Sequence, residues 1–351
     1  MTSKKQTKKG SSALFKAIKW IFISGIIFVA YVAYILFAPN FTVNSDEKSY
    51  LHIPDKSSYE NVLTNLKNEV SIFNLSSFKQ VSLILQYKKH IHPGRYEIKQ
   101  GMNNFELIRL LRSGRQTPVK LTFNNIRTKE QLAGKLGKQL MADSTSIISL
   151  LNDSNYLSGL NLNPNTSICL FIPNTYEVFW NIDAYKLFER MDKEYNKFWT
   201  DERKAQAAAI SLTETEVSTL ASIVEEETNN KKDRPMVAGL YINRLKMGMP
   251  LQADPTVKFA VGDFSIKRIL SGHLKTESPY NTYKIIGLPP GPIRVATPDG
   301  IDAVLHYSHH NYIYMCASET LNGEHKFAIT WKEHLINAKK YRTTLNEMNI
   351  H

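Results

Sequence analysis

The first apolar segment of the chain is a single unbroken run. Trp20 to Ala38 contains 19 residues without a charge, and a helix of that length rises about 28 Å, close to the hydrocarbon thickness of a bilayer. A signal peptide has a shorter apolar core, of about 7 to 15 residues, followed by a small-x-small cleavage site. No such site follows cleanly here. We therefore expect an uncleaved transmembrane helix at residues 17–38 rather than a cleaved signal peptide.

Charge around this run predicts its orientation. Six lysines, at positions 4, 5, 8, 9, 16 and 19, precede the first acid, Asp46. Basic residues favour the cytoplasmic side, so residues 1–16 form a basic cytoplasmic tail and the rest of the chain lies outside. These lysines supply half of the net charge of +12. The remaining excess of positive charge does not indicate a nucleic-acid-binding protein, because arginine and aromatic residues are not interleaved as they are in proteins that bind single strands.

Helix and strand patterns resume after a polar linker at residues 39–45. Ser57–Glu60 (SSYE) has the form of a capping box, and apolar residues from Val62 to Val70 continue at helical spacing. His92–Ile98 (HPGRYEI) predicts a turn into a short strand. Phe105–Leu111 predicts a second helix, ended by Ser113 and Gly114. The alternation of Val119, Leu121 and Phe123 predicts a strand that begins the next unit.

The segment from Ser211 to Asn230 predicts a long helix. Thr213 and Glu216 are spaced as a capping box, and Val217, Leu220, Ala221 and Val224 form one apolar face. Three glutamates follow at positions 225 to 227. At about 100° per residue, only Glu227 lies beside the apolar stripe, about 60° from Val224.

Three adjacent glutamates most often form a solvated helix face. A carboxylate on an apolar face is instead either paired or has a pKa raised by desolvation, which lets it carry a proton at neutral pH. Glu227 is thus a candidate general acid.

Two polar, aromatic loops follow a second predicted helix, whose apolar residues run from Val237 to Leu245 before Gly248. The loops are Leu251–Val257 (LQADPTV) and Ser278–Ile293 (SPYNTYKIIGLPPGPI). Hydrogen-bonding groups and flat aromatic faces together suit a sugar-binding cleft. The alternative is ordinary turn and capping chemistry. The candidate substrate-binding residues are Gln252, Asp254, Thr256, Asn281 and Tyr283.

An ordered set of motifs makes a family resemblance specific. The chain resembles the MltG (YceG-like) endolytic murein transglycosylases over most of residues 17–345. The segment Gly101–Arg115 also resembles the LysM-like module of that family. The motifs are ASIVEEET at 221–228, YINR at 241–244, LQADPTV at 251–257, SPYNTY at 278–283 and GLPPGPI at 287–293, with FIPNTYEV at 171–178 and EHLINAKKYR at 333–342.

The resemblance implies an α+β protein with a single transmembrane helix, a LysM-like module at residues 46–118 and a mixed α+β catalytic domain at residues 119–351. It also implies a lyase that cleaves the β-1,4 bond between N-acetylmuramic acid and N-acetylglucosamine, with formation of a 1,6-anhydro ring, and so terminates elongation of nascent glycan strands. Glu227, followed by Thr228, matches the catalytic acid, and no metal or cofactor is required.

The expected partners are peptidoglycan glycan strands, the membrane and the cell-wall synthesis machinery. The expected location is the inner (cytoplasmic) membrane, with the catalytic domain outside the cytoplasm. Two positions depart from the family pattern: Asn174 replaces an expected acid, and Arg294–Thr297 (RVAT) interrupts a run of small residues.

Two other functional interpretations of the same residues remain. A glycoside hydrolase would use Glu227 as acid with Asp254 or Glu225 as base, and would release reducing ends. A non-catalytic wall-binding or division scaffold would hold glycan without turnover.

Cys169 and Cys316 are too few for a disulfide framework. They form either one bridge or two buried thiols, and we favour the thiols.

Overall fold

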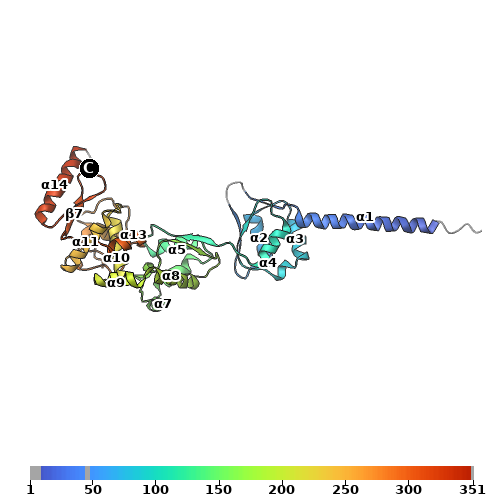
Figure 1. The fold of residues 1–351 in the computed structure, drawn as a ribbon, viewed down its shortest axis with the longest axis horizontal. Coiled ribbons are helices and arrows are strands. Elements are labelled where there is room, and N and C mark those ends of the chain that lie inside the picture. The colour runs from blue at the N-terminus through green and yellow to red at the C-terminus, as the bar shows by residue number, and fades with distance from the viewer. Residues whose placement is uncertain (1–8, 44–47, 349–351) are drawn as a thin grey trace, which may run out of the picture. The chain divides into compact units, whose positions relative to one another are not determined.

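The computed structural model describes residues 9–43 and 48–348. Two compact units make up the chain (Figure 1). The first consists of Met1–Val119 with the short segment Glu177–Asn181, and the second of Lys120–Tyr176 with Ile182–His351.

Helix α1 (Lys9–Phe37) contains the predicted membrane-spanning run. Its segment Leu14–Phe37 has a mean hydropathy of 2.3 and is 6% buried, so by length and composition it can cross a membrane. Most of its side chains lack protein contacts, but Ile35 near its end packs into the core of the first unit. The first eight residues of the predicted basic tail, and Asn44 and Ser45 of the predicted linker, lie outside the described residues.

The first unit is a small α+β assembly. Strands β2 and β4 pair antiparallel, with Leu51 opposite Tyr96, and helices α2, α3 and α4 enclose a core to which both residues belong. Its elements are β1 (Phe41–Thr42), β2 (Ser49–Ile53), α2 (Tyr59–Glu69), β3 (Ser71–Ile72), α3 (Leu75–Ile84), the 3-10 turn η1 (Tyr87–Lys89), β4 (Gly94–Ile98) and α4 (Asn104–Ser113).

Local signals predict this unit well, with one error. Helix α4 ends at Gly114 in the left-handed conformation (φ 65°), and β4 follows the predicted turn. The capping box predicted at Ser57–Glu60 is wrong: Ser58 caps α2 by accepting from the backbone N–H of Asn61, one residue further along. Ser57 instead donates its hydroxyl to the carbonyl of Pro54, which closes a preceding turn.

The second unit is largely helical, with short strands. Its elements are β5 (Val119–Thr122), α5 (Lys129–Gly137), α6 (Ser144–Asn152), α7 (Ser154–Ser158), η2 (Ser167–Leu170), β6 (Thr175–Val178), α8 (Ala184–Phe198), α9 (Asp201–Ala209), α10 (Glu214–Glu227), α11 (Arg234–Lys246), α12 (Asp254–Val261), η3 (His273–Lys275), α13 (Pro298–Leu305), β7 (Tyr314–Ala317), β8 (His325–Ala328) and α14 (Trp331–Glu347).

Helix α10 is the central element of this unit. It begins at the predicted capping box of Thr213 and Glu216, and it contacts α9, α11, α12 and α13. The side chains from Val217 to Glu225 are all buried, including the polar Ser218, Thr219 and Ser222. A helix surrounded on several sides has no single buried stripe, so the one-sided pattern expected from the sequence describes α10 incompletely.

Candidate active site

Three consecutive glutamates end helix α10, and the structure gives each a different environment. Glu225 is buried, whereas Glu226 and Glu227 are partly exposed. Successive helical residues differ by about 100° in direction, so three neighbours face three different surroundings.

Glu227 faces helix α11. The Tyr241 hydroxyl donates a hydrogen bond of 2.7 Å to Glu227 Oε1. Desolvation raises the pKa of Glu227 from 4.5 to about 7; the Tyr241 hydrogen bond and the charges of Lys258 and Arg244 lower it, and Asp254 raises it. A carboxyl with this pKa exchanges a proton near neutral pH and is suited to act as both acid and base.

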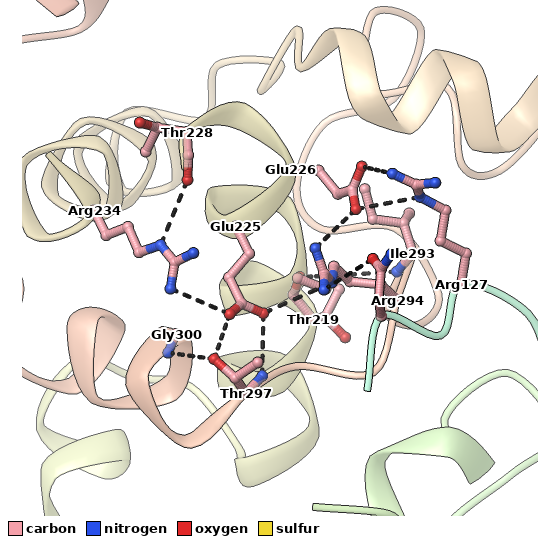
Figure 2. A network of polar contacts seen from close by, with 12 residues as sticks. Arg127, Thr219, Glu225, Glu226, Thr228, Arg234, Ile293, Arg294, Thr297 and Gly300 are labelled. Carbon is pink, nitrogen blue, oxygen red and sulfur yellow. Dashed lines mark hydrogen bonds and ion pairs between the residues drawn. The ribbon is translucent and has the colours of Figure 1, made fainter. Parts of the chain in front are cut away.

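Glu225 is the centre of a buried ionic network (Figure 2). Arg234 lies 3.3 Å from its Oε1, and Arg294 Nε lies 3.9 Å from its Oε2. The Thr297 backbone N–H donates to Oε2 at 3.1 Å, and the Thr297 hydroxyl donates to Oε1. Helical spacing in the sequence predicted that only Glu227 lies beside the buried surface. That was wrong for Glu225, because α13 covers the face of α10 from which it projects.

Glu226 joins α10 to two separate loops. Arg127 donates from Nε at 3.2 Å and from Nη2 at 2.9 Å, which makes a bidentate pair. Arg294 Nη1 donates to Glu226 Oε1 at 2.9 Å (Figure 2). Arg294 therefore contacts two adjacent glutamates. This is the residue that interrupts the small-residue run, and its guanidinium has a structural role in holding the end of α10.

The two predicted loops bring Asp254 and Tyr283 together. The Tyr283 hydroxyl donates to Asp254 Oδ1 at 2.7 Å. Asp254 begins helix α12, and its negative charge is close enough to raise the pKa of Glu227. Gln252 adopts a positive φ of 52°, and its side-chain oxygen accepts from Arg244 Nη1 at 3.4 Å. Three of the five candidate substrate-binding residues thus lie in the neighbourhood of Glu227.

Thr256 and Asn281 are fully buried and bonded within the loops. The Thr256 hydroxyl donates to the Ala253 carbonyl at 2.7 Å. The Asn281 amide donates to the carbonyls of Leu274 and Thr276, at 3.0 and 2.8 Å. Their polar atoms hold the loop backbones in place and are not exposed for contact with a sugar.

Two cavities are both lined by Glu227 and Tyr341. One, of about 660 Å³, is also lined by polar residues of the α10–α11 and β7–β8 connections, among them Asn230 and Asn322, and by His325 at the start of β8. The other, of about 890 Å³, carries four basic side chains beside Asp254: Lys258, Lys267, Arg268 and Arg342. A carboxyl that lines both cavities can reach a bond in the interior of a polymeric ligand that occupies both of them.

The sequence patterns did not identify the arginines and Thr297 around the glutamates. Arg127, Arg234 and Arg294 are separated by up to 167 positions, and no spacing rule relates them. Tyr241 was recognised as part of a buried helix face but not as the partner of Glu227. Its hydroxyl was the available signal, because a buried tyrosine hydroxyl usually has a hydrogen-bond partner nearby.

Both cysteines are free thiols, and Cys169 is buried whereas Cys316 is partly exposed. The favoured interpretation of two thiols is confirmed, although only one of them is buried. Among the described residues, no group of three or more His, Cys, Asp and Glu side chains is arranged to hold a metal ion. Asn174, at the position expected to be acidic, is exposed and accepts from the backbone N–H of Thr175.

Comparison with known proteins agrees with the predicted family and fold. Residues 51–340 match the YceG-like family. The chain is 31% identical over 327 residues to the endolytic murein transglycosylase of Bacillus subtilis, covering 87% of this chain and 88% of that protein. It is 24% identical to the endolytic murein transglycosylase of Streptococcus pneumoniae D39, over 83% of this chain but 58% of the length of that relative.

A solved structure shares the fold. The crystal structure of the yceG-like protein lmo1499 from Listeria monocytogenes aligns with a TM-score of 0.54 and 26% sequence identity, over 83% of this chain and 99% of that one. The fold is therefore the mixed α+β architecture of YceG-like proteins. This chain belongs to the YceG-like family.

Proposed function

We propose that this protein is a membrane-anchored endolytic murein transglycosylase. Relatives that bear this name cover 83% and 87% of the chain. The reaction would cleave the β-1,4 bond between N-acetylmuramic acid and N-acetylglucosamine within a glycan strand and close a 1,6-anhydro ring on the muramoyl product. The observation that carries the proposal is the Glu227 carboxyl, with a pKa of about 7, at the junction of two cavities.

Glu227 would act first as an acid and then as a base. Protonated, it donates to the glycosidic oxygen as the bond breaks. Ionised, it accepts the proton of the muramoyl C6 hydroxyl, whose oxygen attacks the anomeric carbon. The same carboxyl is regenerated, so neither a water molecule nor a carboxylate nucleophile is needed, unlike in paired-carboxylate glycosidases. A pKa near neutrality makes both protonation states accessible in one cycle.

The two cavities suit cleavage inside a strand rather than at its end. Sugars on either side of the scissile bond would occupy the two cavities that meet at Glu227. We propose that Gln252, Asp254 and Tyr283 contact these sugars. Thr256 and Asn281 would contribute indirectly, because their buried hydrogen bonds shape the two loops.

Glu225 is a poor candidate for the base of a hydrolase. Its two oxygens already accept from Arg234, Thr297 and the Thr297 backbone, and its side chain is buried. Asp254 is the carboxylate that a hydrolytic mechanism would use, since it lies near Glu227 and lines the same cavity. The products distinguish the two mechanisms, because hydrolysis leaves reducing ends.

The remaining features of the proposal concern location. Helix α1 would anchor the protein in the cytoplasmic membrane, with its basic end inside, and the rest of the first unit and the second unit would lie outside. A LysM-like module at residues 46–118 would belong to the first unit. A tether of this kind restricts the site to glycan near the membrane, which favours newly made strands and proximity to the synthesis machinery.

The test is digestion of purified peptidoglycan by the full-length protein in detergent, with products read by mass spectrometry. Wild type should release anhydro-muramoyl ends. Glu227→Gln should lose about 10²- to 10⁴-fold in rate, the usual contribution of a general acid and base. Glu202→Gln, the same change on the exposed surface of α9, is the matched control and should keep full activity. Reducing ends would indicate the hydrolase, and binding without cleavage by wild type would indicate a scaffold.

A further inference from the structure

Helix α3 packs along the last turns of helix α1, at three successive levels. Asn40, just beyond α1, exchanges hydrogen bonds with the backbone of Asn74, at 3.0 and 2.8 Å. At the second level, Asn104 donates both to the Ile35 carbonyl at 2.8 Å and to the Ser77 hydroxyl at 3.0 Å. At the third, the Tyr31 hydroxyl donates to Gln80 Oε1 at 2.8 Å.

This order fixes the direction of α3. Positions 40, 35 and 31 descend along α1 while positions 74, 77 and 80 ascend along α3, so the two helices run antiparallel. Tyr31 lies inside the apolar segment Leu14–Phe37. The C-terminal end of α3 therefore points back along the segment that crosses the membrane. Ile84 is four residues beyond Gln80, about 6 Å further in this direction, which is the level of Ile27 on α1.

The end of α3 is apolar and uncovered, and basic residues follow it. Leu83 is 80% exposed and Ile84 is 53% exposed. Lys88 and Lys89, in the turn η1 that follows, are also exposed. Single exposed apolar residues are common on soluble proteins, but an adjacent apolar pair followed by lysines is the combination by which interfacial segments reach lipid headgroups.

We propose that the C-terminal tip of α3, comprising Leu83, Ile84, Lys88 and Lys89, inserts into the outer face of the bilayer beside α1. The bilayer surface would then lie near the level of Tyr31 and Gln80, so that Leu14–Tyr31, about 27 Å of helix, crosses the hydrocarbon. The apolar pair, about 6 Å further in, would enter the acyl boundary, and the two lysines would meet anionic phosphate groups. The occupant is lipid because the tip lies at the level of α1 residues that are themselves apolar and exposed, among them Ile27 and Phe28. The first unit is then held against the membrane at two points, which limits its rotation about α1.

The same helix provides a control at its other end. Phe73 immediately precedes Asn74, at the level of Asn40, and is 73% exposed. It is as exposed and as apolar as Leu83 but lies at the end of α3 directed away from the spanning segment. An apolar side chain that is only exposed should be as accessible to water as Phe73, whereas one that enters lipid should be shielded from water.

The experiment places a bimane fluorophore on the full-length protein at Leu83→Cys, Phe73→Cys or Phe28→Cys, each in a Cys316→Ser background. Burial of Cys169, which raises the pKa of its thiol to about 12, keeps that residue unlabelled. The proteins are placed in nanodiscs of phosphatidylethanolamine and phosphatidylglycerol, with or without brominated acyl chains, and quenching by aqueous iodide is measured in parallel. The Phe28 probe, within the span, is the reference for lipid contact.

Brominated lipid should remove at least half of the emission of the Leu83 and Phe28 probes and leave the Phe73 probe unchanged. Iodide should quench the Phe73 probe severalfold more than the Leu83 probe. Equal iodide quenching at positions 73 and 83, with no effect of bromine at 83, would overturn the proposal. Protection at position 83 from both quenchers would also overturn it, in favour of a protein partner or a second copy. An unquenched Phe28 probe would refute the premise that α1 spans the bilayer, and none of these outcomes depends on glycan cleavage.

Discussion

Tyr241 on helix α11 donates a 2.7 Å hydrogen bond to Glu227 at the C-terminal end of helix α10. This bond opposes the desolvation that raises the pKa of Glu227. Desolvation dominates, and the result is a carboxyl that titrates near pH 7. The balance between desolvation and this hydrogen bond therefore sets the pH range over which the proposed acid is protonated.

Tyr241→Phe should move the pH profile to higher pH. Hydrogen bonds to charged groups contribute about 1.5 to 3 kcal/mol, or about one to two pKa units. Loss of the bond destabilises the carboxylate, so the fall of kcat/KM with rising pH, expected near pH 7 in wild type, should shift upward by about one unit. Tyr185→Phe, on the exposed surface of α8, should leave the profile in place. An unchanged midpoint in Tyr241→Phe would show that this bond does not tune the acid.

The raised pKa of Glu227 also predicts how stability varies with pH. The folded state holds this proton up to about pH 7 and the unfolded state only to about 4.5, so the folded state binds more protons in between. Its contribution to stability is fully present below pH 4.5 and is lost as pH rises through 7. Between pH 5 and pH 8 this loss amounts to about 2 to 3 kcal/mol.

Glu227→Gln removes that titration. In denaturant unfolding, the stability of the variant relative to wild type should be higher at pH 8 than at pH 5 by about the same 2 to 3 kcal/mol. A relative stability that is the same at both pH values would contradict the raised pKa. Glu202→Gln, the same substitution on the exposed surface of α9, is again the matched variant for comparison.

Glu225 and Glu226 should differ in their effect on folding. Glu225→Gln leaves Arg234 partly buried without its ion-pair partner and Arg294 with Glu226 alone, and removal of one partner of a buried pair typically costs about 3 to 5 kcal/mol. Glu226→Gln should cost no more than about 2 kcal/mol, because Arg127 remains partly in contact with water. Urea titration of the two variants tests this order, and equal losses would mean that the ion pairs of Glu225 stabilise the fold no more than those of Glu226.

Gly291 is held against a neighbouring loop. A Cβ atom at this position would lie 2.1 Å from the Asn165 carbonyl oxygen, which belongs to backbone. Gly291→Ala should therefore lower the free energy of unfolding by about 1 to 3 kcal/mol, as overpacking does. Gly272→Ala, with no atom within 4 Å of the added Cβ, should be close to neutral. Similar midpoints for both variants would show that the loop moves aside easily.

Several features of this protein could be predicted from the sequence because they depend only on neighbouring residues. The membrane-spanning run needs only length and hydrophobicity. The capping box of Thr213 and Glu216 is a contact over three residues, and Gly114 ends α4 because the left-handed conformation is least costly for glycine. The candidate acid, Glu227, followed from helical geometry, supported by the ordered motifs of the family. The shift of the first cap from Ser57 to Ser58 marks the limit of such signals, since two adjacent serines compete for one role.

The sequence by itself determined the apolar spanning run, several helices with some of their ends, the family and the position of the candidate acid. Only the tertiary structure decided what surrounds that acid. Burial of Glu225 follows from the packing of α13 against α10, and the arginines that neutralise Glu225 and Glu226 come from loops distant in the chain. The level of α3 along α1 likewise depends on contacts over more than 30 residues. The period of a helix specifies the direction in which a side chain projects, but only the packed chain specifies what it meets there.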